Sequence, residues 1–106
     1  MRTILFAAAL VLTAAPAAAQ DPDAIAEGQS IAEEKCARCH AIGPEGESTL
    51  PIAPAFRTLS ERYPIDDLQE ALAEGIVSGH PAMPEFVFEP EEVAALIAYL
   101  KSIQPM

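Results

Sequence analysis

Residues 36–40 read Cys36-Ala37-Arg38-Cys39-His40, and this C-x-x-C-H stretch decides what the rest of the chain folds around. The spacing is typical of covalent haem attachment. On one turn of helix the two thiols reach the two vinyl groups on one edge of a porphyrin, and the next residue brings its imidazole under the iron. Cys36 and Cys39 are the only cysteines of the chain. The motif therefore predicts one covalently bound haem c, with His40 as an axial ligand of its iron.

The residues alone leave two other functions of the C-x-x-C-H motif open. C-x-x-C also forms structural or redox disulfides in thioredoxin-like proteins, but these need a βαβ framework, and the sequence shows no clear strand pattern. A zinc site is the second alternative, because Cys36, Cys39, His40 and His80 would nominally supply four ligands. No second paired motif accompanies them, and an oxidising compartment threatens free thiols. Haem attachment is the interpretation that the spacing favours.

The second axial position of a haem iron would need another residue, and Met83 is the main candidate. It lies in the irregular, proline-bracketed loop of residues 79–86, between two expected helices. A lone Met is commonly core filler. Met1 belongs to the leader and Met106 is terminal, however, which leaves Met83 as the only internal methionine. His80 is the rival ligand, and an open sixth site is the remaining alternative.

The first 19 residues have the layout of a secretory signal peptide. Arg2 is followed by an apolar run from residue 4 and by an A-x-A tail at residues 17–19. We therefore expect residues 1–19 to be a cleaved signal peptide and residues 20–106 to be one domain, exported to the periplasm. An uncleaved anchor is the alternative, but the apolar run is shorter than the roughly 20 residues that cross a bilayer. No membrane span is expected after cleavage.

The charge balance limits the possible partners. The chain of 106 residues carries a net charge of −10. Such acidity argues against binding nucleic acid or anionic lipid, whose phosphates would be repelled, and favours redox partner proteins with a basic docking patch. Alternatively, the acidity only keeps a small exported protein, expected to be a monomer, soluble.

The rest of the chain predicts an all-α domain with three main helices. The first starts with Asp23 as N-cap and carries Gly28 in its middle, either to let another helix cross closely or as a tolerated weak position. Residues 41–64 are proline-rich loop, with a short helical turn around residues 56–62. A second helix is expected over residues 65–77. The last follows Glu89 and Pro90, with apolar residues at the spacing of a buried face.

With these residues in place, the sequence resembles the class I c-type cytochromes, specifically small exported bacterial ones. The resemblance covers nearly the whole mature chain and rests on Gly28, the C-x-x-C-H motif, the proline-rich loop, Met83-Pro84 and Tyr99-Leu100. It implies the cytochrome c fold, with N- and C-terminal helices crossing near Gly28 and Tyr99-Leu100. It also implies that the His40 ring donates to a carbonyl of the proline-rich loop, at Pro51 or Pro54. The chain departs from the common pattern at Ala32, often aromatic, and in having no Trp.

These observations predict an electron carrier rather than an enzyme. Histidine and thioether ligation favour ferrous iron, and a six-coordinate iron binds no substrate. Two alternatives remain: a haem-based sensor or gas-binding module with a labile or open sixth site, and a redox subunit of a larger enzyme. The apolar residues expected to line the porphyrin are Ile42, Leu50, Phe56, Leu59, Leu68, Leu72, Ile76, Phe86 and Leu96.

Overall fold

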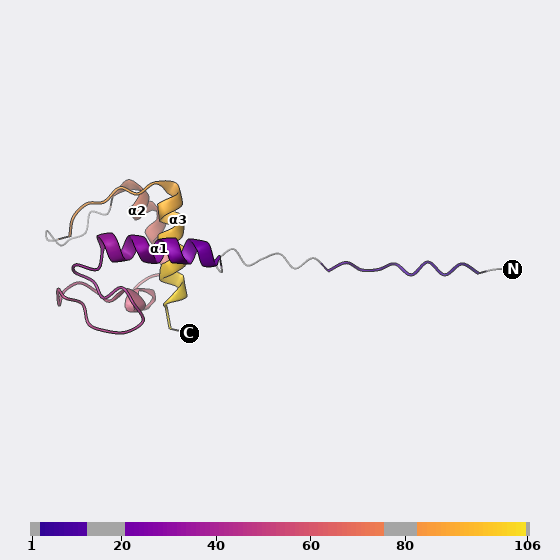
Figure 1. The fold of residues 1–106 in the computed structure, drawn as a ribbon, viewed down its shortest axis with the longest axis horizontal. Helices are drawn as coiled ribbons and strands as arrows, with labels where there is room; N and C mark the ends of the chain where they lie inside the picture. Colours follow the sequence, from indigo (N-terminus) through magenta and orange to yellow (C-terminus); the bar gives the residue numbers. More distant parts are fainter. Residues whose placement is uncertain (1–2, 13–20, 76–82, 106) are drawn as a thin grey trace.

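The computed structural model describes residues 3–12, 21–75 and 83–105, and within these ranges the regular structure is helical with no strand. The elements follow in the order α1 (Pro22–Lys35), η2 (Phe56–Glu61), η3 (Ile65–Asp67), α2 (Leu68–Glu74) and α3 (Pro90–Ser102), where η marks a 3₁₀-helix. Figure 1 shows α1 and α3 crossing at a steep angle, with α2 beside α3. The expected all-α class is confirmed.

Helix α1 begins two residues earlier than the sequence predicts. The side chain of Asp21, not Asp23, caps the helix by accepting from the Asp23 backbone N–H at 3.0 Å. Pro22 takes the first helical position, where its missing N–H costs nothing. At the other end, the N–H of Cys36 still bonds to the Ala32 carbonyl at 2.9 Å. The C-x-x-C-H motif therefore starts where the helix stops, and its position is fixed by α1.

Gly28 lies at the crossing of α1 and α3, as predicted. A Cβ atom at this position would overlap the backbone carbonyl of Ala95 and would lie 2.7 Å from Tyr99 Cβ. The two helices form the most extensive contact between described elements. Only a residue without a side chain allows the backbones to approach this closely.

The second predicted helix is shorter than residues 65–77 and is divided in two. A 3₁₀ turn at Ile65–Asp67 leads into α2, which ends at Gly75 with φ +98°. A positive φ is the conformation that glycine adopts without steric cost. A Cβ on Gly75 would also lie 2.6 Å from Glu85 Oε1. Ile76, expected to belong to this helix and to face the haem, lies outside the described residues.

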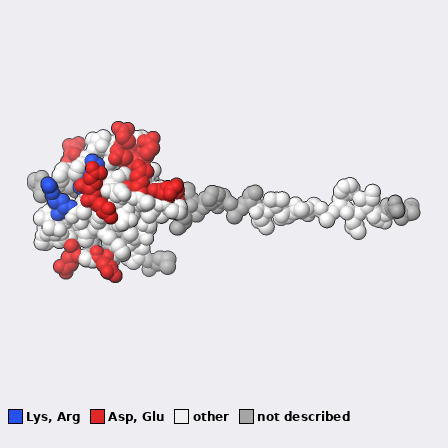
Figure 2. All heavy atoms as spheres, in the orientation of Figure 1, with Lys and Arg blue, Asp and Glu red and all other residues white. Residues whose placement is uncertain are grey.

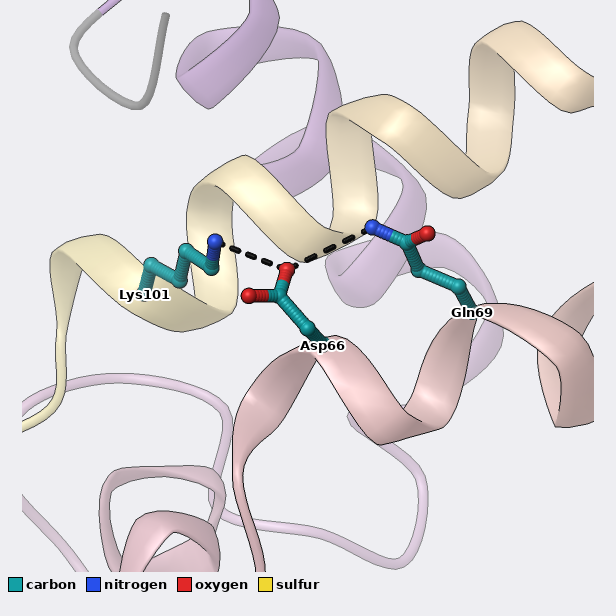
Figure 3. A network of polar contacts seen from close by, with 3 residues as sticks. All are labelled: Asp66, Gln69 and Lys101. Carbon is teal, nitrogen blue, oxygen red and sulfur yellow. Dashed lines mark hydrogen bonds and ion pairs between the residues drawn. The ribbon is translucent and has the colours of Figure 1, made fainter. Parts of the chain in front are cut away.

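Helix α3 follows the sequence prediction closely. Glu89 is the N-cap and forms a reciprocal capping box with Glu92, and Pro90 opens the helix. Seven of its residues from Val93 to Leu100 are buried. All of these except Ala98 join one core with Ile31 and Ala32 of α1, Phe56 and Leu59 of η2, Ile65, Leu72 and Phe88. Outside this core, Lys101 pairs with Asp66 at 2.7 Å, and Gln69 donates to the same carboxylate oxygen (Figure 3).

Residues 3–12 form no helix or strand, and all of them are exposed. No helix in the described part of the chain is long and apolar enough to cross a membrane. The remaining leader residues, including the expected cleavage site after residue 19, lie outside the described ranges. The signal peptide stays a prediction.

Candidate functional site

The C-x-x-C-H motif forms a compact turn at the end of α1. The backbone N–H groups of Cys39 and His40 both donate to the Cys36 carbonyl, at 3.2 and 3.0 Å. This continues the direction of α1 for one irregular turn. Both cysteines and His40 are half-buried and line one cavity. The three residues are therefore presented together.

The ring of His40 has a fixed second contact. Its Nδ1 lies 2.7 Å from the carbonyl oxygen of Pro54. A carbonyl only accepts, so Nδ1 carries the hydrogen and donates, which leaves Nε2 unprotonated in the neutral ring and able to bind a metal. Of the two acceptors expected, Pro51 and Pro54, the structure selects Pro54. The Phe56 ring lies 4.8 Å from the His40 ring, centroid to centroid, and limits its rotation.

Residues 41–62, called here the His40 loop, are tied to the motif by backbone hydrogen bonds. The N–H of Leu50 donates to the Cys39 carbonyl at 3.1 Å, and that of Phe56 donates to the Ala41 carbonyl at 2.9 Å. The Ala41 N–H donates to Ser48 Oγ at 2.9 Å. Although irregular, the loop therefore has a defined conformation.

Residues 83–89, called here the Met83 segment, line the same cavity. Figure 1 shows this segment and the His40 loop on opposite sides of the α1 end. Met83 is half-buried and contributes to the cavity wall. The Phe88 N–H donates to the Leu72 carbonyl at 3.2 Å. Lys35 Nζ lies 5.9 Å from the centroid of the Phe86 ring. His80, the rival ligand, lies outside the described residues.

The cavity suits a large apolar cofactor. Its volume is about 620 Å³, which falls within the 300–1,000 Å³ typical of cofactor sites. Seven of the nine residues expected to line a porphyrin line this cavity: Leu50, Phe56, Leu59, Leu68, Leu72, Phe86 and Leu96. Ile42 does not line the cavity, and Ile76 lies outside the described residues. Lining residues that the sequence analysis missed include Ile52, Tyr63, Phe88 and Leu100.

The two cysteines are free thiols in the structure and form no disulfide. Burial raises the pKa of Cys36 from 9.0 to about 11, and the neighbouring Lys35 lowers it by a smaller amount. In the polypeptide before haem attachment, Cys36 is therefore a neutral thiol near pH 7. The described part of the chain contains no cluster of three or more His, Cys, Asp and Glu side chains able to hold a metal ion.

Charge is unevenly distributed around the cavity. Four charged residues line it and are exposed, and we call them the cavity mouth: Glu34, Lys35, Arg38 and Arg62. Three of the four are cations, although the chain as a whole carries −10. In the face shown in Figure 2, the Lys and Arg atoms lie toward the end where α1 finishes, with Asp and Glu atoms beside them and over the rest of the domain.

Two further residues support the His40 loop and were not singled out as site residues from the sequence. Tyr99 donates its hydroxyl to the Ile42 carbonyl at 2.6 Å. Gln104 donates to the Phe56 carbonyl at 2.8 Å and accepts from the Ser60 N–H at 3.0 Å. Only Tyr99 gave a signal in the sequence, through its place in the helix crossing.

Comparisons with known proteins identify the family of this chain. A family model described as "Cytochrome C oxidase, cbb3-type, subunit III" matches residues 23–100. A protein from Synechocystis sp. called "Cytochrome c-553-like" is 35% identical over 77 residues, which cover 72% of this chain and 66% of the relative. The chain thus spans slightly less than two thirds of that relative's length. No solved structure gives a significant match.

The family match includes both sides of the cavity. It runs from the start of α1, through the C-x-x-C-H motif and Met83, to Leu100 near the end of α3. The half-buried thiols, the His40 ring and the apolar cavity wall fit the cofactor of such domains. The chain therefore belongs to this family of c-type cytochrome domains, has the cytochrome c fold, and carries haem c as its covalently bound, iron-containing cofactor.

Proposed function

We propose that the protein carries single electrons through one haem c, attached by thioether bonds at Cys36 and Cys39 and ligated by His40 and Met83. The supporting observation is that all four residues line the same cavity. They come from the turn that follows α1 and from the Met83 segment, which are 43 or more positions apart in the chain. The donation from His40 Nδ1 to Pro54 supports the assignment of His40, because it leaves Nε2 free to bind iron.

Haem c supplies a one-electron iron couple, and the protein controls its surroundings. Imidazole and thioether ligands raise the reduction potential relative to two nitrogen ligands. The apolar wall, including Phe56, Leu72 and Leu96, would exclude water from a haem iron bound in the cavity. With both axial positions filled by side chains, the iron has no position for substrate. We therefore propose an electron carrier without substrate turnover of its own.

A sensor or gas-binding module would need a labile or open sixth site. The half-buried position of Met83 at the cavity wall supports a closed site instead. His80 remains the rival ligand, and its variant has to be tested beside that of Met83.

A redox subunit of a larger enzyme is a second candidate function. It is favoured by the description of the matching family, which names a subunit of an oxidase. A subunit of a larger enzyme would purify together with a partner protein in a fixed ratio, whereas a free electron carrier would purify alone. Co-purification under mild conditions separates the two.

For the cellular setting, we propose that residues 1–19 are a cleaved signal peptide and that residues 20–106 work in the periplasm as a monomer. The charge layout of the first residues supports export. The partners would be redox proteins, and the net charge of −10 favours those with a basic docking patch.

An optical redox titration of the exported holoprotein, with and without carbon monoxide, tests the proposal. We expect one reversible one-electron transition, a ferric absorption band of iron–methionine bonding, and a ferrous spectrum that carbon monoxide leaves unchanged. Mass spectrometry under denaturing conditions should show the polypeptide plus one haem. Rapid carbon monoxide binding, or the bare polypeptide mass, would contradict it.

A further inference from the structure

The end of α3 and the residues just after it reach across to the His40 loop through two side chains. Tyr99, 4% exposed, donates its hydroxyl to the Ile42 carbonyl at 2.6 Å. Gln104 Nε2 donates to the carbonyls of Phe56 and Leu100, both at 2.8 Å. Gln104 Oε1 accepts from the Ser60 N–H at 3.0 Å. We call Tyr99 and Gln104 the C-terminal clasp.

The clasp holds the loop on both sides of the hydrogen bond between His40 and Pro54. Ile42 follows His40 by two residues, and Phe56 follows Pro54 by two residues. The two ends of this contact are also joined by a backbone bond, because the Phe56 N–H donates to the Ala41 carbonyl at 2.9 Å. Each end of the His40–Pro54 contact is thus anchored to the C-terminal region through a nearby carbonyl.

The tyrosine is suited to this role at ordinary pH. Its pKa is raised above the usual value, first by burial and second by the negative charge of Glu33. The phenol therefore stays protonated and remains a donor. No buried side-chain polar atom of the described residues lacks a hydrogen-bond partner, so the clasp satisfies its own polar groups.

We propose that Tyr99 and Gln104 are positioning residues that keep the His40–Pro54 hydrogen bond in place and thereby hold down the reduction potential of the haem iron. This inference rests on the proposed role of His40 as iron ligand. Donation from Nδ1 makes the imidazole a stronger base, which favours ferric iron. A looser contact with Pro54 removes part of this effect and raises the potential.

The test uses the holoprotein with Tyr99→Phe, Gln104→Leu and the double variant. We expect the midpoint potential to rise in each single variant and further in the double variant. NMR of the ferrous protein can follow the exchange of the His40 Nδ1 hydrogen with solvent. In each single variant we expect this exchange to be about fivefold faster than in the unaltered protein, because a factor of five corresponds to the loss of one net hydrogen bond. Tyr99→Phe keeps the packed ring and removes one oxygen, so it gives a result even if Gln104→Leu does not fold.

Ser102→Ala is the matched control. Its hydroxyl donates to the Tyr99 carbonyl at 2.6 Å within α3 and has no bond to the His40 loop. We expect this variant to leave both the potential and the exchange rate unchanged. Unchanged potential and exchange in Tyr99→Phe and Gln104→Leu, with lower unfolding midpoints, would overturn the inference and leave the clasp a purely structural contact.

The ligand assignment is checked separately in the unaltered protein. If the holoprotein lacks the low-spin spectrum of an imidazole-ligated iron, the proposed function fails and the inference with it. If that spectrum is present and the potential does not respond to the clasp variants, only the inference fails.

Discussion

The two sides of the cavity differ in how firmly they are held. On one side, the His40 loop bonds to the motif through Cys39 and Ala41 and to the C-terminal region through Tyr99 and Gln104. On the other side, the Met83 segment has one described backbone bond to a distant element, from Phe88 to Leu72, and Glu89 at its end forms the capping box of α3 with Glu92. Its other described contacts are the packing of the Phe86 and Phe88 rings on each other and the Lys35 contact to Phe86.

This difference suggests a division of roles between the two proposed ligands. A segment with few hydrogen bonds and more exposed residues opens at lower free-energy cost than a segment with many. We therefore expect His40 to stay bound under all conditions in which the protein is folded. If another ligand replaces one of the two proposed iron ligands, we expect it to replace Met83.

The largest expected effect comes from Met83→Ala, which should open the iron to carbon monoxide. If the sixth site of the unaltered ferrous protein is open about 1% of the time or less, the variant gains about 100-fold in apparent affinity. Stopped-flow binding measures this. Val87→Ala is the matched control in the same segment, because Val87 is 70% exposed and does not line the cavity.

A His80→Ala variant completes that experiment. Rapid binding in His80→Ala together with slow binding in Met83→Ala would assign the sixth ligand to His80 instead. Equal, rapid binding in all proteins, including the unaltered one, would mean that the site is open.

The next largest effect is expected at the helix crossing that both sides share. Gly28→Ala places a methyl group against the Ala95 carbonyl, which is backbone and cannot move aside cheaply. Overpacking costs about 1–3 kcal/mol, and the helical preference of alanine returns about 1 kcal/mol. We expect a net loss of up to about 2 kcal/mol in unfolding free energy, measured by denaturant titration of the holoprotein.

Ser30→Ala, on an exposed position of the same helix, should stay within about 0.5 kcal/mol of the unaltered protein. The iron–methionine band and the far-ultraviolet circular dichroism should change together, because both sides depend on the crossing. Early loss of the band alone in Gly28→Ala would show that the crossing supports mainly the Met83 segment.

A smaller effect is expected from the ion pair of Asp66 and Lys101 (Figure 3), which touches neither side of the cavity. The side chains of Lys101 and Asp66 are 36% and 58% exposed, so solvent screens most of the attraction. Exposed pairs contribute about 0.2–1 kcal/mol. A double-mutant cycle with Lys101→Gln and Asp66→Asn should give a coupling in this range that falls with added salt. A coupling insensitive to salt would contradict the electrostatic origin.

The sequence predicted the parts of the fold that depend on local pattern. The cofactor came from the spacing of Cys36 and Cys39, and the last helix came from Glu89, Pro90 and the apolar spacing that follows. Local pattern also has limits, because Asp21 and Asp23 are both good caps and only the geometry selects Asp21. The end of the second helix at Gly75 depends on a positive φ, which the residue type permits but does not require.

The resemblance implied the helix crossing at Gly28 and a loop carbonyl as partner of His40, but the individual hydrogen bonds between distant residues were not accessible from the sequence pattern. The choice of Pro54 over Pro51 as acceptor depends on the path of the whole loop. The bonds of Tyr99 to Ile42 and of Gln104 to Phe56 join positions 57 and 48 residues apart. No periodic pattern in the sequence indicates that either pair is in contact. Ile42, expected at the cofactor, instead offers its carbonyl to Tyr99.

The smallest predicted effect concerns the charges at the cavity mouth, which come from the end of α1, the C-x-x-C-H motif and the His40 loop. The net charge of −10 predicts that a small cationic redox reagent reacts faster than an anionic one at low salt, and that added salt reduces the difference. The mouth itself carries Lys35, Arg38 and Arg62 against Glu34, so its local field has the opposite sign. Because screening acts over about 10 Å at 0.1 M salt, the local charges should matter most once the reagent is close.

Arg38→Gln should therefore slow the reaction with the anionic reagent by a factor of about two or less, the size of effect expected of one exposed charge. Lys101→Gln, the matched removal of a cation that does not line the cavity, should leave that rate unchanged. Faster reaction of the unaltered protein with the anionic reagent at low salt would show that the mouth outweighs the net charge, and would turn the expected partner surface from basic to acidic.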